Sequence, residues 1–294
     1  MKKYNTLGEL FIDYRSFNNI SQLDFSQSVN VDVRTIQRWE SNVTLVKSDK
    51  EEDIVLETLL PYQLIRNLNA SVPIPTFYDF RIRKYSLTKL TNDLPDASWF
   101  KAQMDISTKR IRRIDFDFDI KYISRFIDSQ HRDNHFVDRE LIKEAVRILP
   151  ELNLVLTDDS GYYSGHCIVL PLKESVYKRL RNREMKKEQL RAVDLINYKQ
   201  LERPIFFNYD ITADCNDNIF YLVCEFFRFF RDYKNKDYLF CSYTERYDSQ
   251  KFAQQLGIKV VWEDKELQEK LGLDVPPRFT EGNYNNFFSN SLGD

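Results

Sequence analysis

One stretch constrains the fold of this chain more than any other: residues 20–42, ISQLDFSQSVNVDVRTIQRWESN. The segments Gln22–Ser28 and Val33–Glu40 are each predicted to form a short helix, with a tight turn between them. Ser21 and Asp32 precede these helices, where a side-chain oxygen can accept hydrogen bonds from the backbone N–H groups of the first turn. The stretch therefore predicts a compact helical hairpin.

The second of these helices has two unlike faces. Ile36 and Trp39 lie about one turn apart, which predicts that one face is buried. The opposite face carries hydrogen-bonding side chains, namely Arg34, Thr35, Gln37 and Arg38. A helix anchored on its apolar side, with donors free on the other side, meets the needs of a helix that reads the major groove of DNA. An amphipathic helical hairpin that binds no DNA is the alternative interpretation.

Residues 5–70 resemble the helix-turn-helix domain of the Cro and phage-repressor (XRE) family. The matching features are Arg15, the Ser21–Gln22 pair, Val31 and the run from Thr35 to Glu40. The family implies an ion pair between Arg15 and Glu40, and a contact of Gln22 with the DNA backbone or a base. Its partner would be double-stranded DNA, bound by a homodimer. The expected DNA-binding residues are Gln22, Val33, Arg34, Thr35, Gln37 and Arg38.

The length of 294 residues predicts two domains. We expect the helix-turn-helix domain over residues 1–70, a basic connector over 71–111, a second domain over 112–275 and a disordered tail over 276–294. Residues 1–70 hold 8 basic and 10 acidic side chains, a net charge of −2, so the first domain is not a basic module. The basic runs RIRK and KRIRR near the connector either add phosphate contacts or form the solvated face of strands.

The composition is typical of a cytoplasmic globular protein. Apolar residues make up 42% of the chain and charged residues 30%, which excludes a disordered chain. The four cysteines have no metal-ligand spacing and are predicted to stay reduced. The longest apolar run, residues 219–230, is too short to span a bilayer, and the N-terminus does not have the pattern of a signal peptide. No membrane partner is expected.

From residue 112 onward strands alternate with helices, which predicts an α/β domain with a mixed sheet. The expected fold class is therefore multidomain: an all-α bundle at the N-terminus, followed by this α/β domain. Two stretches give residues 112–275 a resemblance to the GNAT acetyltransferase family. They are LVLTDDSGYYSGHCIVLPLKESVYKRL, which starts at Leu154, and YLFCSYTERYDSQKFAQQLGIKVV, which starts at Tyr238.

The GNAT resemblance implies acetyl-coenzyme A as cofactor. Family members hold its pyrophosphate with backbone N–H groups at the start of the helix after the fourth strand. The equivalent positions are Asn216, Asp217, Asn218 and Ile219. The loop leading to them has neither the glycines nor the arginine of the family, and Asp214 and Asp217 oppose a polyphosphate. We therefore expect no cofactor, with acetyl-coenzyme A as the alternative.

The catalytic candidates are few. Asp210 can act as a general base through water, or it is simply a carboxylate at a strand end. Ala253 stands where many family members place a general-acid tyrosine, so Tyr243 or Tyr247 would have to substitute. His166 lies on an apolar strand and is predicted to be a core histidine with its hydrogen bonds satisfied.

Two patterns resemble metal sites. On a strand, Asp115, Asp117 and Asp119 would line one face and could hold a hard cation, although a helix cap at Asp119 with solvated neighbours is the favoured interpretation. His131 and His135 have a zinc-compatible spacing but no evident third ligand. No metal is expected.

Two functions follow from these observations. The leading interpretation is a sequence-specific DNA-binding transcriptional regulator whose degenerate GNAT-like domain acts in assembly or ligand sensing, without enzymatic activity. The alternative is an acetyl-coenzyme A-dependent N-acyltransferase that carries a helix-turn-helix targeting domain.

Overall fold

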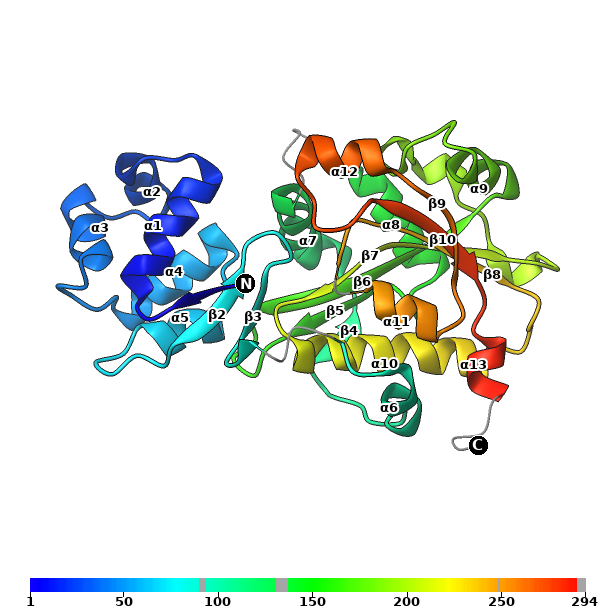
Figure 1. Ribbon diagram of the computed structural model, residues 1–294, viewed down its shortest axis with the longest axis horizontal. Coiled ribbons are helices and arrows are strands. Elements are labelled where there is room, and N and C mark those ends of the chain that lie inside the picture. Colours follow the sequence, from blue (N-terminus) through cyan, green and yellow to red (C-terminus); the bar gives the residue numbers. More distant parts are fainter. Residues whose placement is uncertain (90–93, 131–136, 248, 290–294) are drawn as a thin grey trace. The chain divides into compact units, whose positions relative to one another are not determined.

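The computed structural model describes residues 1–89, 94–130, 137–247 and 249–289. The chain divides into two compact units, whose elements are labelled in Figure 1. The first unit comprises residues 1–92 with 214–216, and the second comprises 93–213 with 217–294. Among the described helices, none combines the length and the apolarity needed to cross a membrane.

The first unit combines helices with a small antiparallel sheet. Its helices are α1 (Leu7–Asn18), α2 (Gln22–Ser28), α3 (Val33–Glu40), α4 (Ser48–Thr58) and α5 (Tyr62–Leu68). Its strands are β1 (Lys2–Tyr4), β2 (Thr76–Asp79) and β3 (Lys84–Ser86), in the order β1-β2-β3. The predicted helical hairpin is therefore present as α2 and α3.

Helix caps and aromatic packing explain how the hairpin forms. The Ser21 side chain accepts from the backbone of Asp24, whose carboxylate accepts in return from the Ser21 backbone, a capping box that starts α2. Asp32 accepts from the Arg34 backbone and starts α3. Phe11 of α1 packs against both helices. Its ring centroid lies 5.2 Å from that of Phe25 in α2 and 6.1 Å from that of Trp39 in α3.

The second unit is built on a seven-stranded mixed sheet in the order β4-β5-β6-β7-β8-β10-β9. The strands are β4 (Ile111–Arg113), β5 (Leu154–Thr157), β6 (Tyr163–Leu172), β7 (Ile205–Ala213), β8 (Leu239–Thr244), β9 (Lys259–Glu263) and β10 (Arg278–Gly282). The β7–β8 pair is parallel, and the other neighbouring pairs are antiparallel. This confirms the predicted α/β domain with a large mixed sheet.

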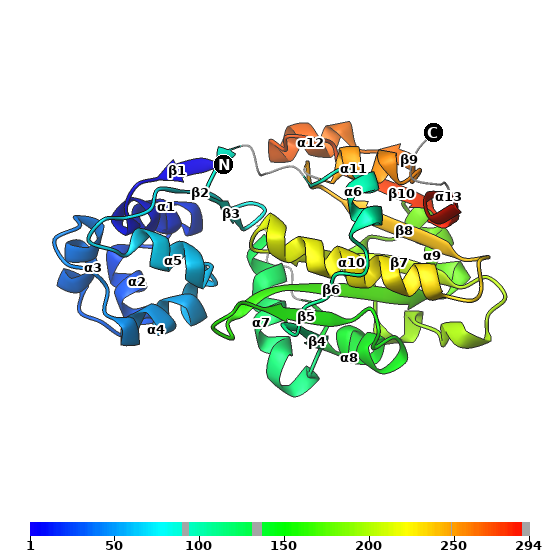
Figure 2. The same cartoon turned by 90° about the horizontal axis from the view of Figure 1, so that it is seen from below.

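Helices cover both faces of this sheet. The α-helices are α6 (Ala97–Ala102), α7 (Phe116–Gln130), α8 (Arg139–Ile148), α9 (Glu174–Arg181), α10 (Asn216–Asp232), α11 (Gln250–Gln255), α12 (Lys265–Leu271) and α13 (Asn285–Ser289). Three 3₁₀ turns, η2 (Lys187–Gln189), η3 (Ala192–Asp194) and η4 (Tyr198–Gln200), lie between α9 and β7. Figure 2 shows α10 on one face of the sheet and α7 and α8 on the other.

The alternation of side chains along β6 produces two apolar cores. Cys167 and Val169 pack into a cluster rich in rings from α10, while Ile168 and Leu170 pack into a cluster formed with α7, α8 and α9. Because both faces are covered, the strand is apolar along almost its whole length. Of the two buried polar residues of β6, Ser164 and His166, the histidine is therefore the more conspicuous.

Three sequence expectations need correction. Residues 278–282 form β10 between β8 and β9, and residues 285–289 form α13, so the predicted disordered tail is wrong for these residues. The alternating aspartates do not lie on a strand, because β4 ends at Arg113 and α7 begins at Phe116. The connector predicted over 71–111 is divided, since β2 and β3 join the first unit while α6 belongs to the second.

Each correction has a physical reason. The tail is polar in composition, yet Arg278, Phe279 and Thr280 are buried, so a few well-placed side chains outweigh the Asn-rich surroundings. The alternation in DFDFD predicts a strand, but aspartate is also favoured in the first turn of a helix. In the structure the helix prevails, with Asp117 and Asp119 in the first turn of α7.

Candidate functional site

Two β-bulges shape the centre of the second unit. Between β5 and β6, Leu156 faces Gly165 and the next residue, Thr157, faces Tyr163, so Ser164 is an extra residue in β6. Between β6 and β7, Ile168 faces Asp210 while Val169 faces Asn208, so Tyr209 is an extra residue in β7. A bulge reverses the alternation of side chains along a strand and re-aims those that follow it.

The first bulge brings Tyr163 onto the same face as His166, and the regular register opposite His166 and Ile168 places Asp210 on that face as well. His166 Nε2 lies 3.0 Å from Asp210 Oδ2, and the Tyr163 hydroxyl contacts His166 Nδ1. The His166 side chain is fully buried, whereas 17% of the Asp210 side chain is exposed. Phe126 of α7 packs over the pair, with its ring perpendicular to the imidazole at 5.9 Å. The prediction that His166 is a buried histidine with satisfied hydrogen bonds is confirmed.

The surroundings of Asp210 favour its ionised form. Burial acts to raise the pKa of the carboxyl group. The hydrogen bond from His166 and the positive charges of Lys187 and Arg246 act against burial and hold the pKa of Asp210 below its ordinary value. Asp210 is therefore an ionised carboxylate that is partly open to solvent. It can accept a proton, although its low pKa makes it a weak base at neutral pH.

Next to Asp210, strand β7 loses its pairing with β8. Among the described residues, the parallel register runs from Ile205 opposite Leu239 to Asn208 opposite Ser242, and β7 continues to Ala213. Beyond the last pair the side chain of Arg246, which follows β8, donates to Thr212 Oγ1 at 3.1 Å. The second half of β7 thus faces β8 with backbone N–H and C=O groups that form no strand pairing with it.

The candidate general acid Tyr243 lies at the end of β8. Its hydroxyl donates to Glu245 Oε1 at 3.1 Å, and Lys187 Nζ lies 5.4 Å from the centroid of its ring. Burial, followed by the negative charge of Glu245, raises the pKa of Tyr243 above its ordinary value. Tyr243 is therefore a neutral phenol that holds a proton. Tyr247, the other candidate, follows β8 in a half-buried position.

The predicted cofactor-binding residues have different surroundings. Asn216 falls in the first unit, while Asp217, Asn218 and Ile219 fall in the second. Asn218 and Ile219 are buried, and Asn218 Oδ1 accepts from Arg110 Nη1 at 2.9 Å. The Asp217 side chain is exposed. Two of the four side chains therefore serve the interior of the second unit.

The acidic triplet does not form a metal site. Asp119 is buried, and its two oxygens accept from Arg112 Nη1 at 2.5 Å and Nη2 at 2.7 Å. Its Oδ2 also accepts from the Asp115 backbone at 2.8 Å, so it caps α7. Within the described part of the chain, no group of three His, Cys, Asp or Glu side chains could hold a metal ion. The predicted pair His131 and His135 lies outside the described residues.

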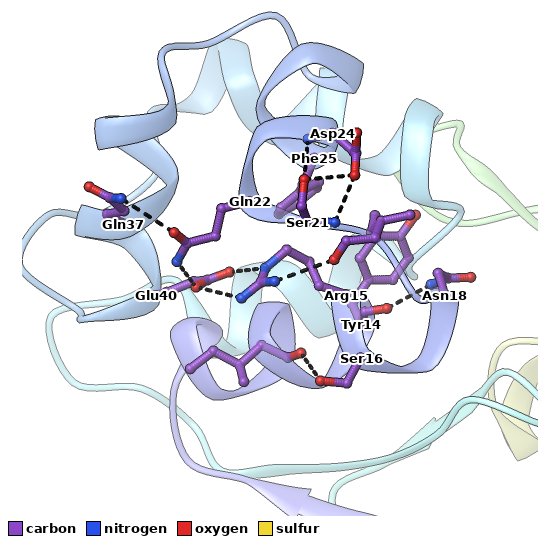
Figure 3. A network of polar contacts seen from close by, with 12 residues as sticks. Tyr14, Arg15, Ser16, Asn18, Ser21, Gln22, Asp24, Phe25, Gln37 and Glu40 are labelled. Atoms are coloured by element: carbon purple, nitrogen blue, oxygen red, sulfur yellow. Dashed lines mark hydrogen bonds and ion pairs between the residues drawn. The ribbon is translucent and has the colours of Figure 1, made fainter.

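A polar network connects the helices of the first unit (Figure 3). Arg15 Nε lies 2.5 Å from Glu40 Oε1 and Arg15 Nη2 lies 3.0 Å from Oε2, a two-point ion pair between α1 and α3. Gln22 of α2 donates to Glu40 Oε2 at 2.6 Å, and Gln37 of α3 donates to Gln22 Oε1 at 3.3 Å. The network therefore fixes α2 and α3 against α1.

The outer face of α3 stays open. Arg34, Gln37 and Arg38 are exposed, and Val33 and Thr35 are half-buried. Ile36 and Trp39 are buried on the opposite face, as the two-faced pattern of α3 predicts. The DNA contacts assigned to these residues and to Gln22 stay predictions.

Sequence reasoning missed Tyr163 and the link from His166 to Asp210. Tyr163 and His166 are three residues apart, a spacing that puts side chains on opposite faces of a regular strand. Asp210 lies on a strand that follows a connection of more than thirty residues, and no turn fixes its register. The available signal was Gly165, since a glycine inside a strand indicates a bulge or a close approach of another backbone. In the structure a Cβ at this position would lie 2.4 Å from the Thr212 carbonyl oxygen.

Comparisons with known proteins find similarity in structure alone. No protein-family model matches the chain, and no curated protein matches it in sequence. In structure the chain is similar to a chain of the NatB acetyltransferase complex bound to a bisubstrate inhibitor, with a TM-score of 0.34 and 10% sequence identity. The similarity covers 60% of this chain and 90% of the other.

This finding corrects the leading interpretation of the sequence. We expected a sequence-specific DNA-binding transcriptional regulator, but the similar structure is an acetyltransferase. That expectation is wrong. The proposal that follows rests on the chain's own sheet and side chains, and not on this similarity.

Proposed function

We propose that the second unit is a GNAT-type N-acyltransferase domain that moves an acyl group from acyl-coenzyme A to an amine. The observation that carries the proposal is the half-paired strand β7, which ends its pairing with β8 at Asn208 and holds the ionised Asp210 two residues later. A site of this kind offers backbone groups for an extended thioester and a base for the attacking amine.

The unpaired backbone of β7 suits the acyl donor. The pantetheine arm of coenzyme A is an extended chain with two amides, so it can add to β7 as a further strand would. Helix α10 follows β7, and its first-turn N–H groups can approach a pyrophosphate at the position that the GNAT resemblance implies. The exposed Asp217 weakens that contact, because its charge opposes a polyphosphate.

The side chains then supply the proton transfers. Asp210 takes a proton from the ammonium group of the substrate, directly or through one water, and the free amine attacks the thioester carbonyl. The C–N bond forms, the C–S bond breaks, and the thiolate leaving group takes a proton from the Tyr243 or Tyr247 hydroxyl. Proton donation by Tyr243 agrees with its raised pKa.

For the first unit, we infer an XRE-type helix-turn-helix domain that targets the acyltransferase to double-stranded DNA as a homodimer. The support is the Arg15–Glu40–Gln22 network, which holds α3 with Arg34 and Arg38 exposed. Replacing both arginines with alanine should abolish mobility shifts of a random DNA pool. Unchanged binding would exclude α3 as the contact surface.

The acyltransferase proposal is tested by binding and by turnover. Acetyl-coenzyme A should raise the melting temperature of the full chain, whereas free adenosine should not. Release of the coenzyme A thiol should then depend on an added amine, and Asp210→Asn should lower the rate by roughly 10²–10⁴-fold. If neither acetyl-coenzyme A nor longer acyl donors stabilise the protein or release thiol with a panel of amines, the proposal is wrong.

A further inference from the structure

The strongest unexplained feature of the second unit is the fully buried imidazole of His166, which has a partner on each nitrogen. Asp210 lies at Nε2 and Tyr163 at Nδ1. The extra residue Ser164 brings Tyr163 onto the face of His166, and a second bulge at Tyr209 directly adjoins Asp210. Bulges on both neighbouring strand pairs indicate a built arrangement, because bulges interrupt the ladder and gather near functional sites.

The hydrogen-bonding groups define which nitrogen carries the proton. An ionised carboxylate accepts only, so Asp210 requires the proton on Nε2. The Nδ1 lone pair then accepts the proton of the Tyr163 hydroxyl. This assigns an imidazole whose Nε2–H is directed at Asp210, which excludes the other tautomer, and a phenol that donates to the free Nδ1 lone pair.

We propose that Tyr163 and His166 are positioning residues: Tyr163 donates to His166 Nδ1 and holds the imidazole in place, and the Nε2–H of His166 in turn holds the Asp210 carboxylate ionised and oriented. The inference deepens the proposed acyltransferase function and rests on it for the catalytic meaning of Asp210. Neither residue touches the reacting atoms. Their effect reaches the reaction only through the state of Asp210.

Other groups face Asp210 and must be separated from this effect. Lys187 of η2 and Arg246 after β8 favour the carboxylate by charge. Tyr209 precedes Asp210 on β7, and burial raises its pKa, so it stays neutral. Helix α7 covers the histidine with the apolar ring of Phe126. The carboxylate is therefore favoured by one hydrogen bond, from the buried His166, and by the charges of two cations that water can screen.

The test measures protonation directly and needs no substrate. Heteronuclear NMR of the full chain with labelled histidine reports the tautomer. The chain has three histidines, so the signal missing in His166→Gln identifies His166. We expect the Nε2–H form in the wild type, with an Nδ1 resonance of a hydrogen-bonded acceptor. This resonance should move to that of a free lone pair in Tyr163→Phe and stay in place in the matched control Tyr162→Phe. A proton on Nδ1 in the wild type, or an unchanged Nδ1 resonance in Tyr163→Phe, would overturn the inference.

The second measurement follows the Asp210 carboxyl by NMR across an acid titration. His166→Leu removes the donor and should raise the pKa of Asp210, whereas His166→Gln offers an amide donor and should keep it low. Equal pKa values in the two variants would mean that His166 only fills space. The acid limb of the kcat/KM profile should move to higher pH in the Leu variant alone. A wild type that transfers no acyl group would refute the proposed function and leave both NMR results standing.

Discussion

Gly8 of α1 lies directly against the backbone of Glu40 at the end of α3. A Cβ at position 8 would lie 2.4 Å from the Glu40 carbonyl oxygen, and the Gly8 N–H donates to Asn42 Oδ1 at 3.3 Å. The two helices can pack at this distance only because position 8 has no side chain.

Gly8→Ala should therefore destabilise the first unit by about 1–3 kcal/mol, since backbone cannot move aside as a side-chain tip can. Chemical denaturation followed by circular dichroism measures the change. The control is Ser16→Ala, an exposed position on the same helix. If the two variants are equally stable, α1 and α3 do not pack as described.

Asp119 should stabilise α7 as a cap and ion-pair partner, and not as a metal ligand. Asp119→Ala leaves Arg112 and the Asp115 N–H without their acceptor and should cost about 1.5–3 kcal/mol. Asp117→Ala, an exposed neighbour, should change stability by less than about 0.5 kcal/mol. Differential scanning calorimetry compares the variants. A reversal of their order, or a large stabilisation of the wild type by magnesium, would restore the metal interpretation.

Phe230 should be among the most sensitive positions of the second unit. It is fully buried, and its ring centroid lies 4.9 Å from that of Tyr238 and from that of Phe226. Phe230→Ala should lower the free energy of unfolding by about 3–5 kcal/mol, through lost burial and the cavity left behind. Phe118→Ala should cost less than about 1 kcal/mol, since 57% of Phe118 is exposed. Urea unfolding monitored by fluorescence distinguishes the two.

A chain that stops after Asp274 should fail to fold its second unit. It lacks β10, whose residues pair with β8 on one side and β9 on the other. A chain that stops after Ser289 keeps β10 and α13 and should melt like the full chain. Limited proteolysis and circular dichroism report the difference. Equal protease resistance of the two chains would restore the prediction of a disordered tail.

Alkaline pH should destabilise the protein in a defined window. Burial raises the pKa of Tyr78, Tyr198 and Tyr238 to about 12, from an ordinary value of 10.0. A raised pKa means that folding favours the neutral phenol. This stabilisation is fully present below about pH 10 and is lost as the pH rises toward about 12.

Ultraviolet absorbance of tyrosinate and unfolding experiments at matched pH values test this window together. The buried tyrosines should ionise only as the free energy of unfolding falls. Ionisation of all tyrosines near pH 10, with no loss of stability, would contradict the burial of these three side chains.

The sequence predicted elements better than it predicted the site. The boundaries of α2 and α3 follow from Ser21, Asp32 and the spacing of Ile36 and Trp39, all of which act within one or two helical turns. Asp210 was identified as a candidate base because it lies on a strand, which required only local reasoning. Its partner His166 could not be found in this way, because their contact depends on the register of β6 against β7, and that of Tyr163 on a bulge at Ser164. Residue spacing reveals neither.

The same limit explains the error at the end of the chain. The composition of residues 276–294 is that of a disordered segment, and composition averages over a window. Strand formation by Arg278–Gly282 depends on a gap between β8 and β9 that only the assembled sheet defines. Non-local partners of this kind leave no trace in the segment itself.

The place of β10 also sets an order of events during synthesis. Strands β8 and β9 each pair with β10, so this end of the sheet cannot close before residue 282 has left the ribosome. Most of the first unit, by contrast, lies within residues 1–92 and can fold while the second is still being translated. Between the synthesis of Thr244 and that of Gly282, the nascent protein thus exposes the incomplete edge of β8, which makes this late interval the period in which chaperones matter most.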